Sequence, residues 1–198
     1  MLKVGITGGI GSGKTTICRI FETLGIPVFY ADTVAKHIMV QDAILMEGVV
    51  NAFGPESYLQ GGALNNRHIA DIVFNNAAEL VKLNALVHPA VFRAFDTWLT
   101  GLSQDVPYVL KEAALLFESG SYSLCDQNIL VIAPDHLKLE RVMKRDSVTA
   151  NAVRARMDKQ FADRQKLKMT DHIVYNNEND SLIEQVLALH QLFLNHRA

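Results

Sequence analysis

The residues with the clearest chemical potential stand near the start of the chain, where Gly8 is followed by four residues and then by Gly13-Lys14-Thr15. This is the phosphate-loop pattern G-x-x-x-x-G-K-[ST]. Its glycines let successive backbone N–H groups point at one anion, while the lysine reaches the β- and γ-phosphates and the threonine hydroxyl binds Mg²⁺. The pattern predicts a nucleoside triphosphate site with Mg²⁺ on Thr15, built from Gly9, Ile10, Gly11, Ser12, Gly13, Lys14, Thr15 and Thr16.

Such a loop works only between a strand and a helix, and the flanking sequence predicts both. Val4 and Ile6 form a short apolar run before the loop. After it, apolar residues recur at helical spacing until Gly25 supplies a stop. The helix then adds its positive N-terminal end to the anion site.

Four further short apolar runs predict strands, at 27–30, 106–110, 128–132 and 171–175. Helical stretches separate them, so the chain is expected to form an α/β fold with a five-stranded parallel sheet flanked by helices. The helices expected are residues 33–53, one capped by Asn65 or Asn66, two at about 77–87 and from Pro89 to Leu102, and one opened by the capping box Ser181-Leu-Ile-Glu184.

Two of the connections are too long for plain crossovers. We expect residues 33–105 to form a helical acceptor-binding insertion and 135–169 to form a helical lid, on a nucleotide-binding core of 1–32, 106–134 and 170–198. Residues 138–168 carry ten Lys or Arg against four acids, whereas the rest carries nine against seventeen. This concentration fits either a solvated helical face or a segment that meets polyanions.

The bulk composition excludes several classes of protein. The net charge of −2 argues against general nucleic-acid binding. No apolar run is long enough to span a bilayer, and the N-terminal residues do not resemble a signal peptide. Cys18 and Cys125 stand far apart, as expected of free thiols in a cytoplasmic protein. A monomer and a small homo-oligomer both stay open.

Two carboxylates are expected at the carboxyl ends of strands, where ligands bind in such sheets. Asp32 follows the second strand and is either the general base that takes a proton from an acceptor hydroxyl or a helix cap. Glu112 ends the third strand and either holds Mg²⁺ through water or is an exposed strand-end charge. A GTPase is not indicated, because no [NT]-K-x-D or D-x-x-G sequence occurs, so the residues favour a small-molecule or nucleotide kinase.

Beyond these motifs, the chain resembles the dephospho-CoA kinase family nearly from end to end. The resemblance is carried by Gly5-Ile-Thr-Gly-Gly-Ile-Gly-Ser-Gly-Lys-Thr15, Ala31-Asp32, Phe53-Gly54, Gly62-x-Leu64-Asn65, Val73-Phe74, Leu83-Asn84, His88-Pro89, Leu115-Leu-Phe-Glu118, Arg141 with Arg145, Arg156-Met157 with Gln160, and Asp171 with Asn176. It implies a P-loop kinase that transfers the ATP γ-phosphate to the ribose 3′-hydroxyl of dephospho-CoA, with a CoA-binding helical domain and a lid.

The resemblance also implies residue roles. Asp32 would be the catalytic base, Arg141 would lie near the ATP phosphates, and Asn176 would lie where the fold holds adenine. For the acceptor it implies Thr7, Asp32 and His88, although a histidine before a helix-starting proline is equally expected as a packed residue.

The sequence departs from the family pattern at three places. Tyr30 replaces the first residue of Asp-Ala-Asp, Ala114 replaces a proline, and Asn66 stands where the family has arginine. The arginine lies one position on, so Arg67 is the candidate that takes over its contact with the acceptor. The alternatives are another P-loop kinase acting on a nucleoside or small alcohol, and a nucleotide-binding regulatory module that needs no base.

Overall fold

The computed structural model describes residues 1–74 and 76–196. The chain divides into two compact units, one formed by Met1–Tyr30 and Ser103–Ala198 and the other by Ala31–Leu102. The first unit carries the sheet, and the second consists of helices and short connections. Within the described residues no helix combines the length and apolarity needed to cross a membrane.

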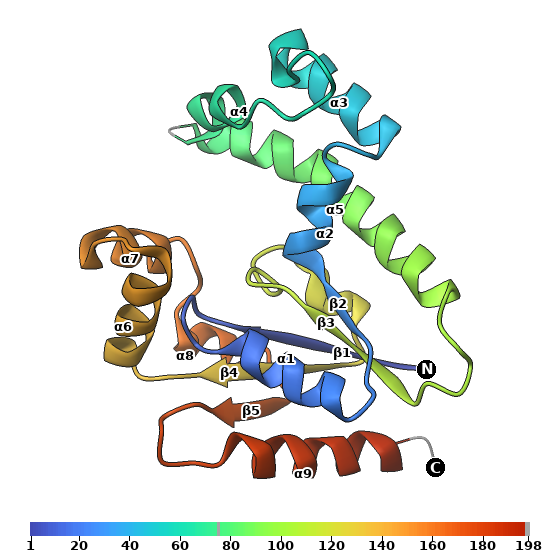
Figure 1. Ribbon diagram of the computed structural model, residues 1–198, viewed down its shortest axis with the longest axis vertical. Helices are drawn as coiled ribbons and strands as arrows, with labels where there is room; N and C mark the ends of the chain where they lie inside the picture. Colours follow the sequence, from blue (N-terminus) through green and yellow to red (C-terminus); the bar gives the residue numbers. More distant parts are fainter. Residues whose placement is uncertain (75, 197–198) are drawn as a thin grey trace. The chain divides into compact units, whose positions relative to one another are not determined.

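The sheet of the first unit has five strands, β1 (Leu2–Gly8), β2 (Val28–Tyr30), β3 (Tyr108–Glu112), β4 (Gln127–Ile132) and β5 (His172–Tyr175). All pair in parallel in the order β2-β3-β1-β4-β5, as Figure 1 shows. The predicted α/β fold with a five-stranded parallel sheet is therefore confirmed. Because β1 is central, the loop that follows it opens at the middle of the carboxyl edge.

Alternation along β1 sends its side chains to two differently covered faces. Val4 and Ile6 join the main apolar core with α1 (Lys14–Thr23) and α9 (Leu182–Asn195), which lie on the same side of the sheet (Figure 1). On the other face, any side chain at Gly5 would collide with the Asn128 amide, and the segment with the short helix η2 (Ser121–Leu124) covers it. The sheet is thus buried on both faces, as its continuous apolar strands require.

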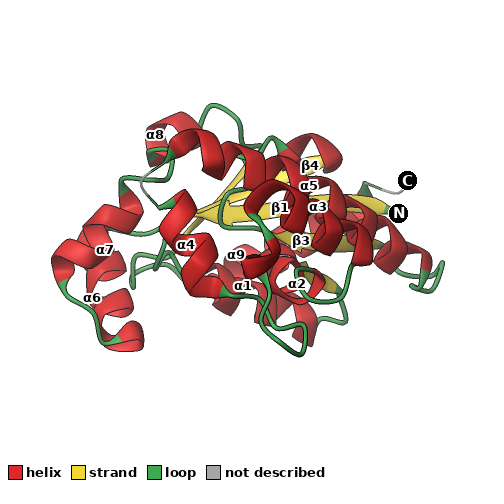
Figure 2. Cartoon of the chain, turned by 90° about the horizontal axis from the view of Figure 1, so that it is seen from above, coloured by secondary structure: helices red, strands yellow, loops and turns green. Residues whose placement is uncertain are grey.

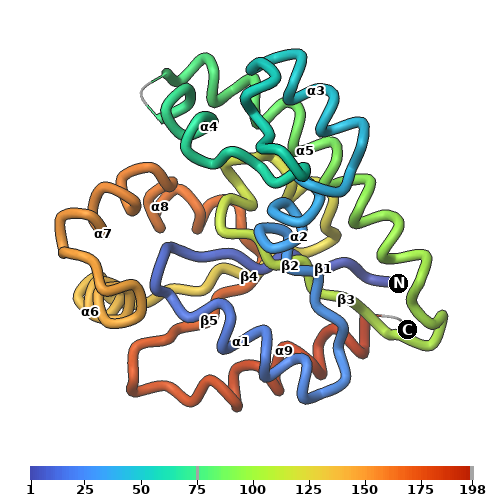
Figure 3. The backbone as a smooth tube through the Cα atoms, turned by 45° about the horizontal axis from the view of Figure 1, so that its top comes forward, coloured from blue at the N-terminus to red at the C-terminus, as the bar shows by residue number. Residues whose placement is uncertain are grey.

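The basic stretch between β4 and β5 is helical, as predicted. It forms α6 (Asp135–Asp146), α7 (Ala150–Met157) and α8 (Asp163–Lys166), which Figure 3 traces in orange before the chain returns to β5. At the end of α6, ion pairs with Arg145 and Arg156 lower the pKa of Asp146 to about 2. Since that carboxylate is charged at any physiological pH, the α6–α7 corner keeps its ion pairs.

The second unit consists of α2 (Ala31–Ile38), α3 (Ala43–Phe53), the short helix η1 (Pro55–Ser57), α4 (Asn66–Val73) and α5 (Ala77–Thr100), drawn as red helices in Figure 2. Its own core gathers residues from α3, α4 and α5, including Leu45, Val49 and Ile69. Asn65 caps α4, one of the two caps predicted, by accepting the His68 N–H at 3.2 Å.

The helical stretch predicted at 33–53 is confirmed as two helices, whereas the helix start predicted at Pro89 is wrong. The stretch 33–53 is not one helix, because the chain turns at 39–42 and Asp42 caps α3 by accepting the Leu45 N–H at 2.8 Å. The helices at 77–87 and 89–102 are instead the single helix α5, with Pro89 inside it. A proline inside a helix costs about 3 kcal/mol, and the burial of Ala90, Val91 and Phe95 just beyond it offsets that cost.

Candidate functional site

The phosphate loop lies between β1 and α1 and turns back on itself, with the Ser12 N–H donating to the Gly9 carbonyl oxygen at 3.0 Å. Gly11 and Gly13 have φ of +78° and +94°, conformations that side chains disfavour, so the loop depends on glycine at both positions. Gly13 is the N-cap residue of α1 and no side chain caps this end. The first N–H groups of α1 therefore lack a side-chain acceptor and can bind phosphate oxygens.

The side chains of the loop fit a polyphosphate. Lys14 is buried and its Nζ donates to the carbonyl oxygens of Gly8 at 2.9 Å and Gly9 at 3.4 Å. The Ser12 hydroxyl is buried and makes no hydrogen bond within the described structure. Thr15 and Thr16 lie exposed in the first turn of α1. A buried ammonium and an unsatisfied buried hydroxyl in one loop are what a bound triphosphate would engage.

Arg141 and Asn176 come from distant parts of the chain and meet at this loop. Asn176 Nδ2 donates to the Ser12 carbonyl oxygen at 2.8 Å, and Arg141 Nη2 donates to Asn176 Oδ1 at 3.3 Å. The amide packs so closely on Gly13 that a side chain there would collide with it. Arg141 Nη1 is buried with no hydrogen bond within the described structure. It is a second donor at the loop that an anion would satisfy.

Glu112 lies where the sequence placed it, at the carboxyl end of β3, but it is buried rather than exposed. Its partners in the sheet are Ile6 of β1 and Tyr30 of β2. The Glu112 carboxylate also acts on Cys18, which lies in α1. Burial raises the pKa of the Cys18 thiol, and the negative charge of Glu112 raises that pKa further. Cys18 is therefore a neutral core thiol, not a nucleophile.

The predicted acceptor residues belong to both units. Thr7 is buried in the first unit, where its Oγ1 donates to the Ala114 carbonyl oxygen at 3.4 Å. Asp32 is exposed in the first turn of α2, two residues after β2 ends. His88 is half-buried in α5 and stacks on Phe92 with ring centroids 6.5 Å apart.

The second unit holds a pocket of about 750 Å³ by itself. Most of its lining is apolar or small, and its polar side chains are Lys36, Asn66 and Asn84. The Arg67 side chain is 93% exposed, 3.9 Å from Asp71, and is not among the described residues that line the pocket. The cation present in the lining is Lys36, which lies one helical turn after Asp32 on α2.

The chain matches the dephospho-CoA kinase family over residues 2–181. The chain belongs to the dephospho-CoA kinase family. The predicted family, the P-loop kinase fold and the assignment as a kinase of this family are thereby confirmed.

Individual relatives of this kinase support the same family assignment. It is 39% identical over 178 residues to a dephospho-CoA kinase from Salinibacter ruber, covering 89% of each chain. A crystal structure of a protein from Thermus thermophilus superposes with a TM-score of 0.86 at 32% identity, covering 98% of this chain and 97% of the other. A dephospho-CoA kinase from Campylobacter jejuni gives a TM-score of 0.71 at 26% identity, over 99% and 98% of the two chains.

Two features of this kinase are not predicted by its motifs. Lys36 as a pocket residue had one signal, its spacing of four residues from Asp32, which places both on one face of a helix. Gln160 had a signal as part of the family motif with Arg156-Met157, but its contact with the phosphate loop had none, because 150 residues separate it from Ile10.

Proposed function

We propose that this chain transfers the γ-phosphoryl group of ATP to the ribose 3′-hydroxyl of dephospho-CoA, giving CoA and ADP. The observation that carries the proposal is the phosphate loop with Lys14 buried in it, in a chain of the dephospho-CoA kinase family. The fold supplies the parts that phosphoryl transfer needs, namely aligned backbone donors, fixed cations and an edge of the sheet at which an acceptor can bind.

On the donor side, the backbone of residues 9–16 would hold the phosphates. Lys14 would turn from the Gly8 and Gly9 carbonyl oxygens to the β- and γ-phosphates, and Arg141 would use its unpaired Nη1 on the same anion. Arg is suited to that contact because its planar fork binds phosphate in two places. Asn176 would position Arg141 and line the nucleotide site through the Ser12 carbonyl.

Mg²⁺ fits this donor set. The described residues contain no cluster of three His, Cys, Asp or Glu side chains suited to a metal. Mg²⁺ in a phosphate-loop site does not require such a cluster, because it keeps several waters and takes oxygen ligands from the phosphates. We propose that the Thr15 hydroxyl ligates it and that Glu112 holds one of its waters. When bound, the ion would neutralise charge on the transferring phosphoryl group.

Asp32 is the proposed general base. It lies two residues after β2 ends, and ligands in this class of fold bind beyond the carboxyl ends of the strands. An exposed carboxylate in the first turn of a helix can orient a hydroxyl and accept its proton as the phosphoryl group leaves ATP.

For the acceptor, we propose that residues 33–105 form the binding domain and that its pocket holds the apolar part of dephospho-CoA. Lys36, which lines that pocket, would face the phosphates of the acceptor. Thr7, Arg67 and His88 stay as further candidates. Residues 135–169 would act as the lid over a core of 1–32, 106–134 and 170–198.

We further propose the cytoplasm as the site of action, in keeping with the free thiols Cys18 and Cys125. The protein would act as a monomer or small homo-oligomer, which sedimentation velocity over a range of concentrations would distinguish.

The deciding experiment supplies ATP, Mg²⁺ and one hydroxyl acceptor at a time, and measures ADP release together with the phosphorylated product. Dephospho-CoA should be turned over and yield CoA. Its 3′-deoxy analogue is the matched control, because it lacks only the accepting hydroxyl and should give no ADP above the ATPase background. Faster turnover of adenosine or a simple alcohol than of dephospho-CoA would favour another P-loop kinase instead.

A further inference from the structure

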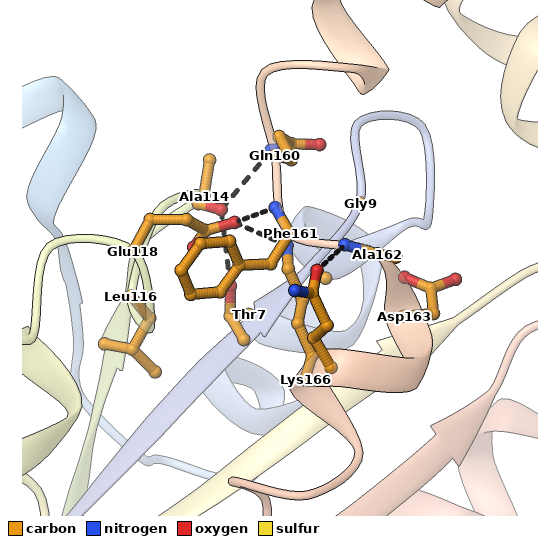
Figure 4. Close-up of polar contacts among 12 residues, drawn as sticks. Thr7, Gly9, Ala114, Leu116, Glu118, Gln160, Phe161, Ala162, Asp163 and Lys166 are labelled. Carbon is orange, nitrogen blue, oxygen red and sulfur yellow. Dashed lines mark hydrogen bonds and ion pairs between the residues drawn. The ribbon is translucent and has the colours of Figure 1, made fainter.

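One side chain from the segment between α7 and α8 joins two separate loops of the core. Gln160 is half-buried, and its Oε1 accepts the Ile10 N–H of the phosphate loop at 2.8 Å. Its Nε2 donates to the Ala114 carbonyl oxygen at 3.4 Å, as Figure 4 shows. Both ends of a single amide are therefore engaged, and each engages backbone rather than a mobile side chain.

The two loops that Gln160 joins are those that carry the proposed donor-side chemistry. Ile10 lies within the loop that would surround the phosphates, and Ala114 lies two residues after Glu112 at the end of β3. The Ala114 carbonyl oxygen also accepts the Thr7 hydroxyl at 3.4 Å, which connects it to β1. A shift of the Gln160 amide would therefore move the loop tip relative to the segment after β3.

The backbone that carries Gln160 is itself fixed to the core. Glu118 Oε1 accepts the N–H of the next residue, Phe161, at 2.8 Å and lies 3.1 Å from the Nζ of the fully buried Lys166 (Figure 4). On the other side of the segment, Asp163 Oδ2 pairs with Lys138 Nζ at 2.6 Å. Gln160 thus extends from a segment that is held by two ion pairs with buried lysines.

We infer that Gln160 is a positioning residue for phosphoryl transfer: it sets the phosphate-loop tip against the segment after β3, and so aligns the loop donors with Glu112. The inference rests on the proposed function. Gln160 acts through Ile10 and Ala114 and needs no contact with either substrate. Misplacing a reacting group by about 1 Å can cost about 100-fold in rate, so loss of this amide is expected to lower kcat.

The test compares two variants of the full chain. Gln160→Ala removes both hydrogen bonds and is expected to lower kcat about 10- to 100-fold with little change in the KM for dephospho-CoA. Gln160→Glu keeps the shape of the side chain. When ionised it loses the donor to Ala114, and when protonated it regains one through its O–H. Because the ordinary glutamate pKa is about 4.3, this side chain stays almost fully ionised between pH 8 and 5.5, and kcat should stay below that of the wild type throughout this range.

A matched control lies five residues away in the same segment. Gln165 Oε1 accepts the Ala162 N–H at 3.0 Å, a contact local to the start of α8, and Gln165 is exposed. Gln165→Ala should leave kcat within about twofold of the wild type, and thermal unfolding of all three variants shows whether each is folded at the assay temperature. Unchanged kcat in Gln160→Ala, a wild-type kcat in Gln160→Glu, or an equal loss in Gln165→Ala overturns the inference.

A second measurement keeps this inference separable from the proposed function. Amide hydrogen exchange at Ile10 is expected to be at least about tenfold faster in Gln160→Ala than in the wild type, whether or not any acceptor is phosphorylated. Equal exchange rates would overturn the positioning role. A wild-type chain that exchanges slowly at Ile10 but does not phosphorylate dephospho-CoA would instead contradict the proposed function alone.

Discussion

Replacing Glu118 by glutamine should destabilise the first unit strongly, because it leaves a buried ammonium without a counter-ion. The Lys166 side chain is 0% exposed and that of Glu118 is 12% exposed, with Nζ 3.1 Å from Oε1. Within the described residues, Lys166 Nζ has no hydrogen-bond partner. Among the described residues, the ion pair with Glu118 is therefore the polar interaction that compensates the buried ammonium.

The size of the effect follows from this burial. Removing one partner of a buried ion pair typically costs about 3–5 kcal/mol. Glu118 Oε1 also accepts the Phe161 N–H at 2.8 Å. Glutamine keeps an oxygen that can accept this hydrogen bond, so the bond is retained and adds nothing to the cost. We therefore expect about 3 kcal/mol, which corresponds to a fall in Tm of roughly 6–12 °C for a chain of this size.

The assay is urea unfolding followed by far-UV circular dichroism at pH 7, with Lys166→Met and the double variant completing a cycle. Replacing a whole buried pair by neutral groups is often close to neutral. The double variant should therefore lie within about 1 kcal/mol of the wild type.

An exposed pair in the second unit provides the control. Lys82 Nζ lies 2.6 Å from Glu79 Oε1, but the Lys82 side chain is 59% exposed. Glu79→Gln should cost less than about 1 kcal/mol, since solvent screens such pairs. An unchanged urea midpoint in Glu118→Gln would refute the argument from burial, as would a double variant that loses the sum of the two single effects.

The remaining predictions concern the proposed catalytic and binding residues. Lys14→Ala should fold normally by circular dichroism and keep less than about a tenth of wild-type kcat, since lost transition-state contacts of this kind cost about 3 kcal/mol. Arg141→Lys should lower kcat while calorimetry shows unchanged dephospho-CoA affinity; weakened acceptor binding with normal kcat would move Arg141 to the acceptor side. Asp32→Asn should lose about two or more orders of magnitude in single-turnover transfer, whereas near-normal chemistry would remove Asp32 from the mechanism. Lys36→Ala and Arg67→Ala should each raise the KM for dephospho-CoA but not that for ATP, with the larger effect at Lys36, which lines the pocket; equal changes in both constants would contradict an acceptor role.

Much of this fold was predictable because its signals are local. The strand, loop and helix around Lys14 lie within about twenty consecutive residues, and the pattern there needs no long-range information. The same holds for Asn65 and Ser181, whose side chains cap helices through N–H groups three residues away.

What the sequence could not give depends on contacts that form only in the folded chain. Pro89 predicts a helix start by local rules, yet apolar burial beyond it keeps α5 continuous. Glu118 and Phe161 are 43 residues apart, and Gln160 and Ile10 are 150 apart. Spacing along the chain carries no trace of such pairs. The residues of a local motif are therefore the predictable part of the site. The residues that position that motif through long-range contacts are not predictable from spacing.

The placement of the helical unit within the chain has a consequence for folding during synthesis. β1 and β2 pair only with β3 and β4, which begin at Tyr108 and Gln127, so residues 1–30 contain no strand pairing of their own. The intervening Ala31–Leu102 is one continuous segment with its own core. At roughly 5–20 residues per second, the ribosome needs roughly 4–16 s to pass from β2 to β3. The helical segment can fold in that interval. The phosphate loop is synthesised first, but β1, which leads into it, can pair only after β3 and β4 have been made.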